Sequence, residues 1–228
     1  AADALFAVQL GLTANPSARF RRDWDAIRGS SSRPSALVQA LREFVTVVGD
    51  GSNLILDPDL DSYYLMDIAV SALPTHLERL LQIREALAAP LRDAAWSTES
   101  RARAALYAQL LDDADLDRIE RSAGVALREN ARARIAAEFQ RTYPAALDAF
   151  LGTQRRLASA LRELNAAERP TFDVRTFEHL LREADRAAVA HWNITADQLD
   201  SVLAARIAHF RSQRREALLL SLGVLLLI

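Results

Sequence analysis

Four closely spaced carboxylates are the residues best placed to do chemistry: Asp57, Asp59, Asp61 and Asp67. Carboxylate oxygens are ligands that Ca²⁺ and Mg²⁺ prefer, but the segment lacks the glycine and the terminal glutamate of an EF-hand loop. Acidic side chains at a helix start also bind the free N–H groups there and interact favourably with the helix dipole. We favour this capping role, with Asp57 as the N-cap and Pro58 at the first helical position.

Polar side chains near these carboxylates are candidates for binding a small solute. Tyr63 and Tyr64 are adjacent, so they point to different sides of a helix, and we expect one ring in the core and the other in a pocket. Arg84 interrupts an apolar stripe, so it needs an anionic partner. We favour a carboxylate of residues 57–67, which we call the acidic segment, over an anionic ligand. The candidate ligand-binding residues are Asn53, Asp57, Asp61, Tyr63, Tyr64 and Arg84. We also expect Arg128, Arg132, Arg134 and Gln154 to point inward, where each needs a polar partner or a ligand.

Patterns of catalytic and cofactor sites are missing from the sequence. There is no glycine-rich phosphate loop, no Gly-x-Ser-x-Gly and no His-Glu-x-x-His. The absence of cysteine excludes disulfides, thiolate metal sites and cysteine nucleophiles. We therefore expect no catalytic residue, no metal ligand and no cofactor. Surface or interhelix positions are expected for the four histidines, His76, His179, His191 and His209.

The composition predicts an all-α protein. Half of the 228 residues are hydrophobic, and glycine and proline occur only seven times each. Ala, Leu, Arg and Glu dominate, which favours helix throughout. We expect an elongated helical bundle, either single or built as two stacked four-helix bundles that share long helices, with a division near 90–112. The net charge of −2 and the interspersed charges argue against a nucleic-acid partner.

Capping residues and prolines predict the helix boundaries. The helix from Asp57 is bent or ended at Pro74, and Ser97 caps a helix to about residue 111. A long helix then runs from residues 112–115 until Pro144 stops it. Asp173 caps the next helix, and a capping box at Thr195 opens the last one. Earlier helices are expected over 3–13, 15–28 and 34–48.

Apolar residues at helical spacing over 145–165 give the clearest pattern and predict a coiled-coil-like seam. Its residues are Leu147, Phe150, Leu151, Gln154, Leu157, Ala158, Leu161 and Leu164. Leu65 and Met66 are likewise expected in the core.

The chain closes on an apolar run, residues 217–228, preceded by Arg211, Arg214 and Arg215. As a helix this run spans about 18 Å, which is less than a bilayer core of roughly 30 Å. We expect it to be the start of a transmembrane helix, because a run that is apolar on all faces is hard to bury at a chain end. The other reading is a C-terminal helix packed in the core.

The segment Asn-Leu-Ile-Leu-Asp-Pro-Asp-Leu-Asp-Ser-Tyr-Tyr-Leu-Met-Asp, residues 53–67, resembles a motif in helical sensing regions of bacterial membrane receptors. These receptors include sensor histidine kinases, chemoreceptors and cyclic-di-GMP enzymes. The resemblance is densest over residues 49–74 and implies a periplasmic helical bundle between two transmembrane helices. It extends to the helical bimodular type, which stacks two four-helix bundles and can bind small organic acids.

Together these observations predict an extracytoplasmic sensor region over residues 1–216, with residues 217–228 entering the inner membrane. The expected partners are a small molecule or periplasmic protein as signal, the inner membrane and a second copy in a homodimer. Helix displacement would carry the signal to a cytoplasmic output, with a histidine kinase favoured. The alternative is a structural or protein-interaction bundle that dimerises through the 147–164 seam without a small ligand.

Overall fold

The computed structural model describes residues 42–43, 45, 59–134, 136–170 and 172–226, and in these ranges the chain is helical without any strand. The prediction of an all-α bundle is confirmed. Helices α4 (Leu60–Asp67), η2 (Ile68–Ala72) and α5 (Leu73–Arg92) join end to end as a first rod. A second rod consists of α6 (Thr98–Gln109), η3 (Leu110–Leu116) and α7 (Asp117–Ala133). The third and fourth rods are α8 (Ala137–Ala166) and α9 (Val174–Leu226).

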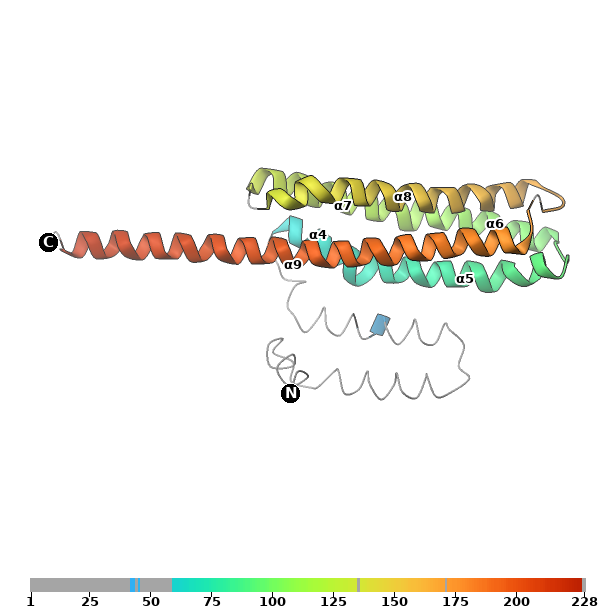
Figure 1. The fold of residues 1–228 in the computed structure, drawn as a ribbon, viewed down its shortest axis with the longest axis horizontal. Coiled ribbons are helices and arrows are strands. Elements are labelled where there is room, and N and C mark those ends of the chain that lie inside the picture. The colour runs from blue at the N-terminus through green and yellow to red at the C-terminus, as the bar shows by residue number, and fades with distance from the viewer. Residues whose placement is uncertain (1–41, 44, 46–58, 135, 171, 227–228) are drawn as a thin grey trace.

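The four rods lie side by side as one four-helix bundle, and each rod contacts two neighbours (Figure 1). The first rod packs on the second through α4 with α7 and α5 with α6, while α8 packs on α6 and α9. The short connections around residues 93–97, 134–136 and 167–173 make consecutive rods antiparallel, as in other up-and-down bundles. A second bundle stacked on this one stays a prediction.

Buried apolar side chains at helical spacing fill the space between the rods. Leu65, Leu80 and Phe139 are fully buried, and Met66 is 5% exposed. The core positions of Leu65 and Met66 are therefore confirmed. All eight residues of the predicted seam over 147–164 are buried too, and α8 uses them against α6 and α9 of the same chain. They are thus not available for the dimerisation that the alternative function assigned to them.

Two short π-helical segments interrupt the first and second rods without breaking them. The first, η2, comes directly before Pro74. A proline inside a regular α-helix lacks an N–H and clashes with the carbonyl four residues back, here that of Val70. The wider π turn accommodates that clash, and the helix continues through Pro74. Of the two outcomes predicted from the sequence, a bend or an end at Pro74, the end is therefore wrong. The second, η3, turns Asp115 inward between the buried Leu111 and Leu116.

Other predicted boundaries are partly right. Ser97 is an N-cap whose Oγ accepts a hydrogen bond from Ser100 N at 3.2 Å, and Asp173 Oδ1 accepts one from Thr176 N at 2.9 Å, so both caps are confirmed. Pro144 lies inside α8 and stops nothing. The real break is at Arg134, whose left-handed backbone (φ 54°) closes α7.

The first described helix, α4, has Asp59 at its N-cap, with extended backbone and no side-chain cap bond. The expected cap two residues earlier, Asp57, lies outside the described residues, and so do the predicted helices over 3–13, 15–28 and most of 34–48. Because α4 begins at Leu60, the capping role assigned to Asp57 for this helix is wrong. Asp61 does lie in the first turn, where a negative charge is favoured.

The longest helix, α9, contains 53 residues and is continuous through Thr195, so the predicted helix start there is wrong. Its first part forms one wall of the bundle, and its last part extends beyond the other rods (Figure 1). Ile207 and Phe210 are 50% and 58% exposed, and Leu218 and Leu219 are exposed still more. Across the described residues, none of the helices combines the length and the apolar character that a membrane crossing requires.

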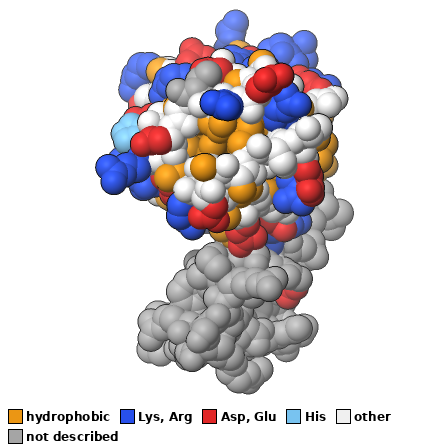
Figure 2. Space-filling model, turned by 90° about the vertical axis from the view of Figure 1, so that its right-hand side faces the viewer, with side chains coloured by type: hydrophobic (Ala, Val, Ile, Leu, Met, Phe, Trp, Pro, Cys, Tyr) orange, Lys and Arg blue, Asp and Glu red, His pale blue; other side chains and the backbone are white. Residues whose placement is uncertain are grey.

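The opposite end of the bundle carries charges of both signs. Figure 2 looks at this end and shows Arg side chains interspersed with Asp and Glu around a smaller apolar area. No face of a single sign is visible in that view.

Candidate functional site

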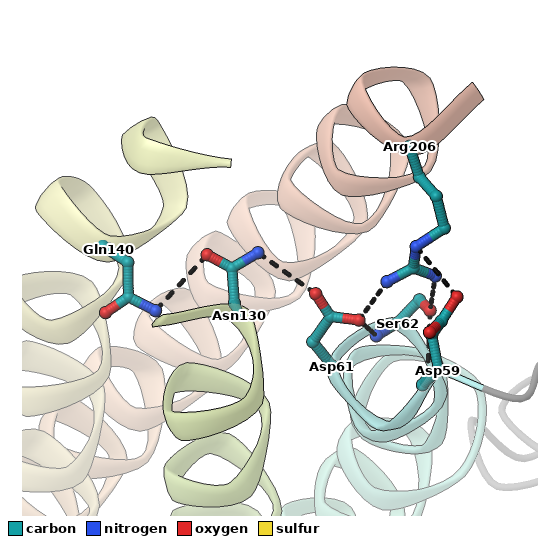
Figure 3. A network of polar contacts seen from close by, with 6 residues as sticks. All are labelled: Asp59, Asp61, Ser62, Asn130, Gln140 and Arg206. Atoms are coloured by element: carbon teal, nitrogen blue, oxygen red, sulfur yellow. Dashed lines mark hydrogen bonds and ion pairs between the residues drawn. The ribbon is translucent and has the colours of Figure 1, made fainter. Parts of the chain in front are cut away.

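A polar network lies at the end of the bundle from which α9 emerges, and all four rods contribute to it (Figure 3). The start of the first rod provides three residues from the acidic segment, and the last turns of α7, the first turn of α8 and the buried part of α9 provide one each. We call this set the helix-exit network. Its members are Asp59, Asp61, Ser62, Asn130, Gln140 and Arg206.

Arg206 is the centre of the helix-exit network. Its Nε lies 3.0 Å from Asp59 Oδ2, its Nη1 donates to Ser62 Oγ at 2.6 Å, and its Nη2 pairs with Asp61 Oδ1. Arg206 is only 7% exposed and Asp61 only 2%. The planar guanidinium presents its N–H groups in a fixed fork, so three partners on one helix start define the position of α9 closely.

Asp61 is bound from both sides. Its Oδ1 accepts from Ser62 N at 2.8 Å, and its Oδ2 accepts from Asn130 Nδ2 at 3.1 Å. Gln140 Nε2 in turn donates to the carbonyl of Leu127 at 2.5 Å and lies 3.3 Å from Asn130 Oδ1. The network therefore continues from α9 through α4 and α7 to α8.

Burial makes this network sensitive to change. Two charges removed from water are stable only while they remain paired, and removal of one partner from a buried pair costs about 3–5 kcal/mol. The network therefore contributes less to net stability than to a defined arrangement of the rods. Chemically, it can hold α9 in one position and release it when the pairing is lost.

The candidate ligand-binding residues of the sequence do not form one site. Asp61 belongs to the helix-exit network, whereas Tyr63 and Tyr64 pack half-buried against the core, with ring centroids 5.3 Å apart and edge to face. Arg84 lies 23 residues beyond Asp61 along the first rod, about 35 Å away at helical rise. Asn53 and Asp57 lie outside the described residues.

The partner of Arg84 is not the acidic segment that we favoured. Arg84 Nη2 donates to Asp185 Oδ2 at 2.6 Å, and its Nε lies 3.8 Å from Glu178 Oε2, with both carboxylates on α9. Arg84 thus joins α5 to α9 at a partly exposed position. Another acidic residue of the segment, Asp67, pairs instead with Arg118 of α7 at 2.6 Å.

The inward orientation expected for three arginines of α7 and its C-terminal turn is also wrong, since Arg128, Arg132 and Arg134 are exposed. Gln154 is buried as expected, and its Nε2 donates to the carbonyl of Ala184 at 2.9 Å.

A second polar cluster lies inside the bundle and includes two of the four histidines, His76 and His191. His76 Nδ1 is 3.3 Å from Asp115 Oδ2, and Arg79 binds the same carboxylate at 2.9 Å. Asp115 belongs to the π segment η3, and His76 follows the π segment η2 by four residues. Segments of this kind often occur at functional sites.

Neither cluster has the composition of a metal centre within the described part of the chain. No group of three or more His, Cys, Asp or Glu side chains gathers there in a way that could hold a metal ion. Asp59 and Asp61 face Arg206, and Asp67 faces Arg118, so these acids of the segment are committed to arginine rather than to a shared cation.

Sequence reasoning missed Arg206 and His191, although a local signal was present. On α9 the buried positions recur every three or four residues, and polar side chains occupy three of them. The full stripe is Phe177, Leu181, Ala184, Ala188, His191, Thr195, Leu199, Val202 and Arg206. The predicted helix start at Thr195 divided this stripe, so the continuity of the buried face was lost.

Comparison with known proteins adds no family to this description. The chain matches no protein-family model, no curated protein and no solved structure at a significant level.

Proposed function

We propose that this chain is an extracytoplasmic signal-sensing domain of a bacterial membrane receptor. It binds a small solute or a periplasmic protein and passes a helix displacement along α9 to a cytoplasmic output, with a histidine kinase favoured. The observation that carries the proposal is the form of α9, one continuous helix that is a wall of the bundle at one end and free of it at the other. The likeness of residues 53–67 to receptor sensing regions agrees with it.

The dimensions of α9 suit a mechanical link. Its 53 residues extend over about 80 Å, and the buried part ends at Arg206. Helix shifts of about 1–2 Å at packed interfaces are a known form of signal coupling. A shift of the first rod relative to α9 acts directly on the helix-exit network, because Asp59 and Asp61 lie at the start of that rod.

The exposed end of α9 supports a membrane anchor. Leu218 and Leu219 are 59% and 69% exposed, and the sequence stays apolar to residue 228. A lipid environment would shield these side chains. The three arginines before this run, Arg211, Arg214 and Arg215, are on the bundle side, however, and positive charge is more common on the cytoplasmic side of a membrane helix. The orientation is therefore the feature to test first.

The 228 residues contain no cysteine, so one introduced thiol reports the orientation once any cysteine elsewhere in the full natural protein has been replaced by serine. Arg169→Cys places it in the exposed turn between α8 and α9. In intact cells that carry the full natural protein, a membrane-impermeant maleimide should label this thiol. Ala158→Cys, at a fully buried position of α8, is the matched control and should be labelled only after denaturation. If the Arg169→Cys variant is labelled only after lysis, the bundle lies in the cytoplasm and the proposal is contradicted.

The alternative, an interaction bundle without a small ligand, has one observation in its favour. Ile207 and Phe210 are large, exposed and one helical turn apart on α9, as expected of a helix that pairs with another chain. A thermal-shift screen with small organic acids, amino acids and sugars separates the two functions. A ligand that binds the folded chain raises its melting temperature with concentration. If no compound raises it while the chain dimerises through Phe210, the interaction function is supported instead.

A further inference from the structure

Two histidines from different rods lie at one level in the middle of the bundle. His76 of α5 is fully buried and His191 of α9 is 1% exposed. Phe150 of α8 contacts both rings, with centroids 5.5 Å from His76 and 4.7 Å from His191, and it stacks nearly parallel on the latter. We call these three residues the histidine layer. It joins α9 to its two neighbours in the bundle, α5 and α8.

The hydrogen bonds around His191 define which of its nitrogens carries the hydrogen. Thr195 Oγ1 donates to the carbonyl of His191 at 2.8 Å, which uses the only hydroxyl hydrogen of Thr195. Tyr143 Oη lies 3.2 Å from Thr195 Oγ1, so the tyrosine must be the donor there. Its oxygen then accepts from His191 Nε2, 3.4 Å away. The neutral ring therefore carries its hydrogen on Nε2 and a lone pair on Nδ1.

The same reasoning applies to His76. The carboxylate of Asp115 accepts two hydrogen bonds from Arg79, at 2.9 and 3.3 Å, and only accepts in this state. His76 Nδ1, 3.3 Å from Asp115, is thus the donor. The other nitrogen of each ring, His76 Nε2 and His191 Nδ1, is buried without a hydrogen-bond partner among the described residues.

An additional proton on His191 would go to Nδ1, where no described group accepts a hydrogen bond. Burial lowers the pKa of His191 from 6.5 to about 4, and the neighbouring His76 acts in the same direction. The titratable and charged groups around the layer are Tyr143 from α8, His76 and Arg79 from α5, and Asp115 from η3. Arg79 already binds the one carboxylate of this set.

We propose that the histidine layer is an acid-sensitive lock on α9, which holds this helix against α5 and α8 while His191 is neutral and loosens it when His191 takes up a proton. The proposal follows from the packing and hydrogen bonding of the layer and does not depend on the proposed sensing function. Loosening acts at the middle of the buried part of α9, between the ion pair of Arg84 with Asp185 and the helix-exit network at Arg206.

The sign of the pH dependence follows from the lowered pKa. The unfolded chain binds a proton at His191 below about pH 6.5, whereas the folded chain resists it down to about pH 4. The contribution of His191 to the free energy of unfolding is therefore fully present above pH 6.5 and is lost as the pH falls toward 4. With these values the unfolding equilibrium constant rises about 30-fold between about pH 8 and pH 5.

Nuclear magnetic resonance of the histidine side chains in the unaltered chain tests the premise, with each of the four signals assigned by single substitutions. The His191 signal should remain that of a neutral imidazole with Nε2–H down to about pH 5. A His191 that titrates near pH 6.5 in the folded chain overturns the proposal, and so does a neutral ring with its hydrogen on Nδ1.

Loosening is measured with Ala188→Cys, a buried position one turn before His191 on α9. Its rate of reaction with a disulfide reagent that is active in acid is divided by the rate of a small free thiol at the same pH. This ratio should rise about tenfold or more between about pH 7.5 and pH 5. In the His191→Phe background, which keeps a ring against Phe150, the rise should disappear. His209→Gln, at an exposed histidine of the same helix, is the matched control and should keep it. An equal rise in all three backgrounds overturns the lock.

Discussion

Arg206 and Asp61 form a buried ion pair between residues 145 positions apart in the sequence. Asp61 is in the first turn of α4 and Arg206 is the last buried residue of α9 before that helix leaves the bundle. The pair thus joins the acidic segment, which is the most distinctive part of the sequence, to the helix proposed to carry the signal.

Loss of this arginine should destabilise the fold strongly. Arg206→Met leaves the Asp61 carboxylate buried without its cation, and the free energy of unfolding should fall by about 3–5 kcal/mol in urea titrations. Arg182→Ala is the matched control on the same helix, because Arg182 is half exposed in its pair with Glu178, and it should cost less than about 1 kcal/mol. Similar losses in the two variants would contradict the buried pairing.

Removal of both charges should cost less than the two single losses together. In Asp61→Leu with Arg206→Met no uncompensated charge remains, and apolar side chains often replace a buried pair without loss. A double-mutant cycle should therefore give a coupling energy of about 1–3 kcal/mol. A coupling near zero would mean that the two side chains act independently.

Tyr143 should control the alkaline stability of the chain. Burial raises its pKa to about 12, so the unfolded chain loses the phenolic proton near pH 10 while the folded chain keeps it. Stability should fall as the pH rises from 10 to 12, by up to about 3 kcal/mol. The chain has neither lysine nor cysteine, so those groups do not titrate in this range. Tyr143→Phe should show a smaller fall across the same interval, and an unchanged fall would contradict the assignment.

Arg84→Ala tests whether that arginine has a role beyond its ion pair. The pair with Asp185 is about one-third exposed, so its loss should cost at most about 1 kcal/mol in the free energy of unfolding. Asp185→Asn should have a similar effect. If Arg84→Ala also abolishes a ligand-induced rise in melting temperature that Asp185→Asn retains, then Arg84 binds the ligand, as the sequence led us to consider.

Features set by local pattern were predictable from the sequence. Helical composition predicts the all-α fold, and the caps at Ser97 and Asp173 follow from short-range hydrogen bonds. The seam of α8 follows from its spacing alone, because every position of the stripe faces the same side of one helix.

Features set by tertiary contact were not predictable in this way. Thr195 begins a good capping box by local rules, but inside the bundle its hydroxyl bonds back to His191 and the helix continues. Pro144 is tolerated within α8, where packing on two neighbouring rods outweighs the lost hydrogen bond. The pairing of Arg206 with Asp61 depends on how distant rods are placed, and no spacing within either helix contains that information.

The central claim is that the helix-exit network fixes how α9 leaves the bundle. Electron paramagnetic resonance tests it with spin labels on two introduced cysteines, Arg132→Cys at the exposed end of α7 and Gln213→Cys on the free part of α9. We expect one narrow distance distribution in the otherwise unaltered chain and a broad or shifted one after Arg206→Met. The same narrow distribution with and without Arg206 would contradict the claim.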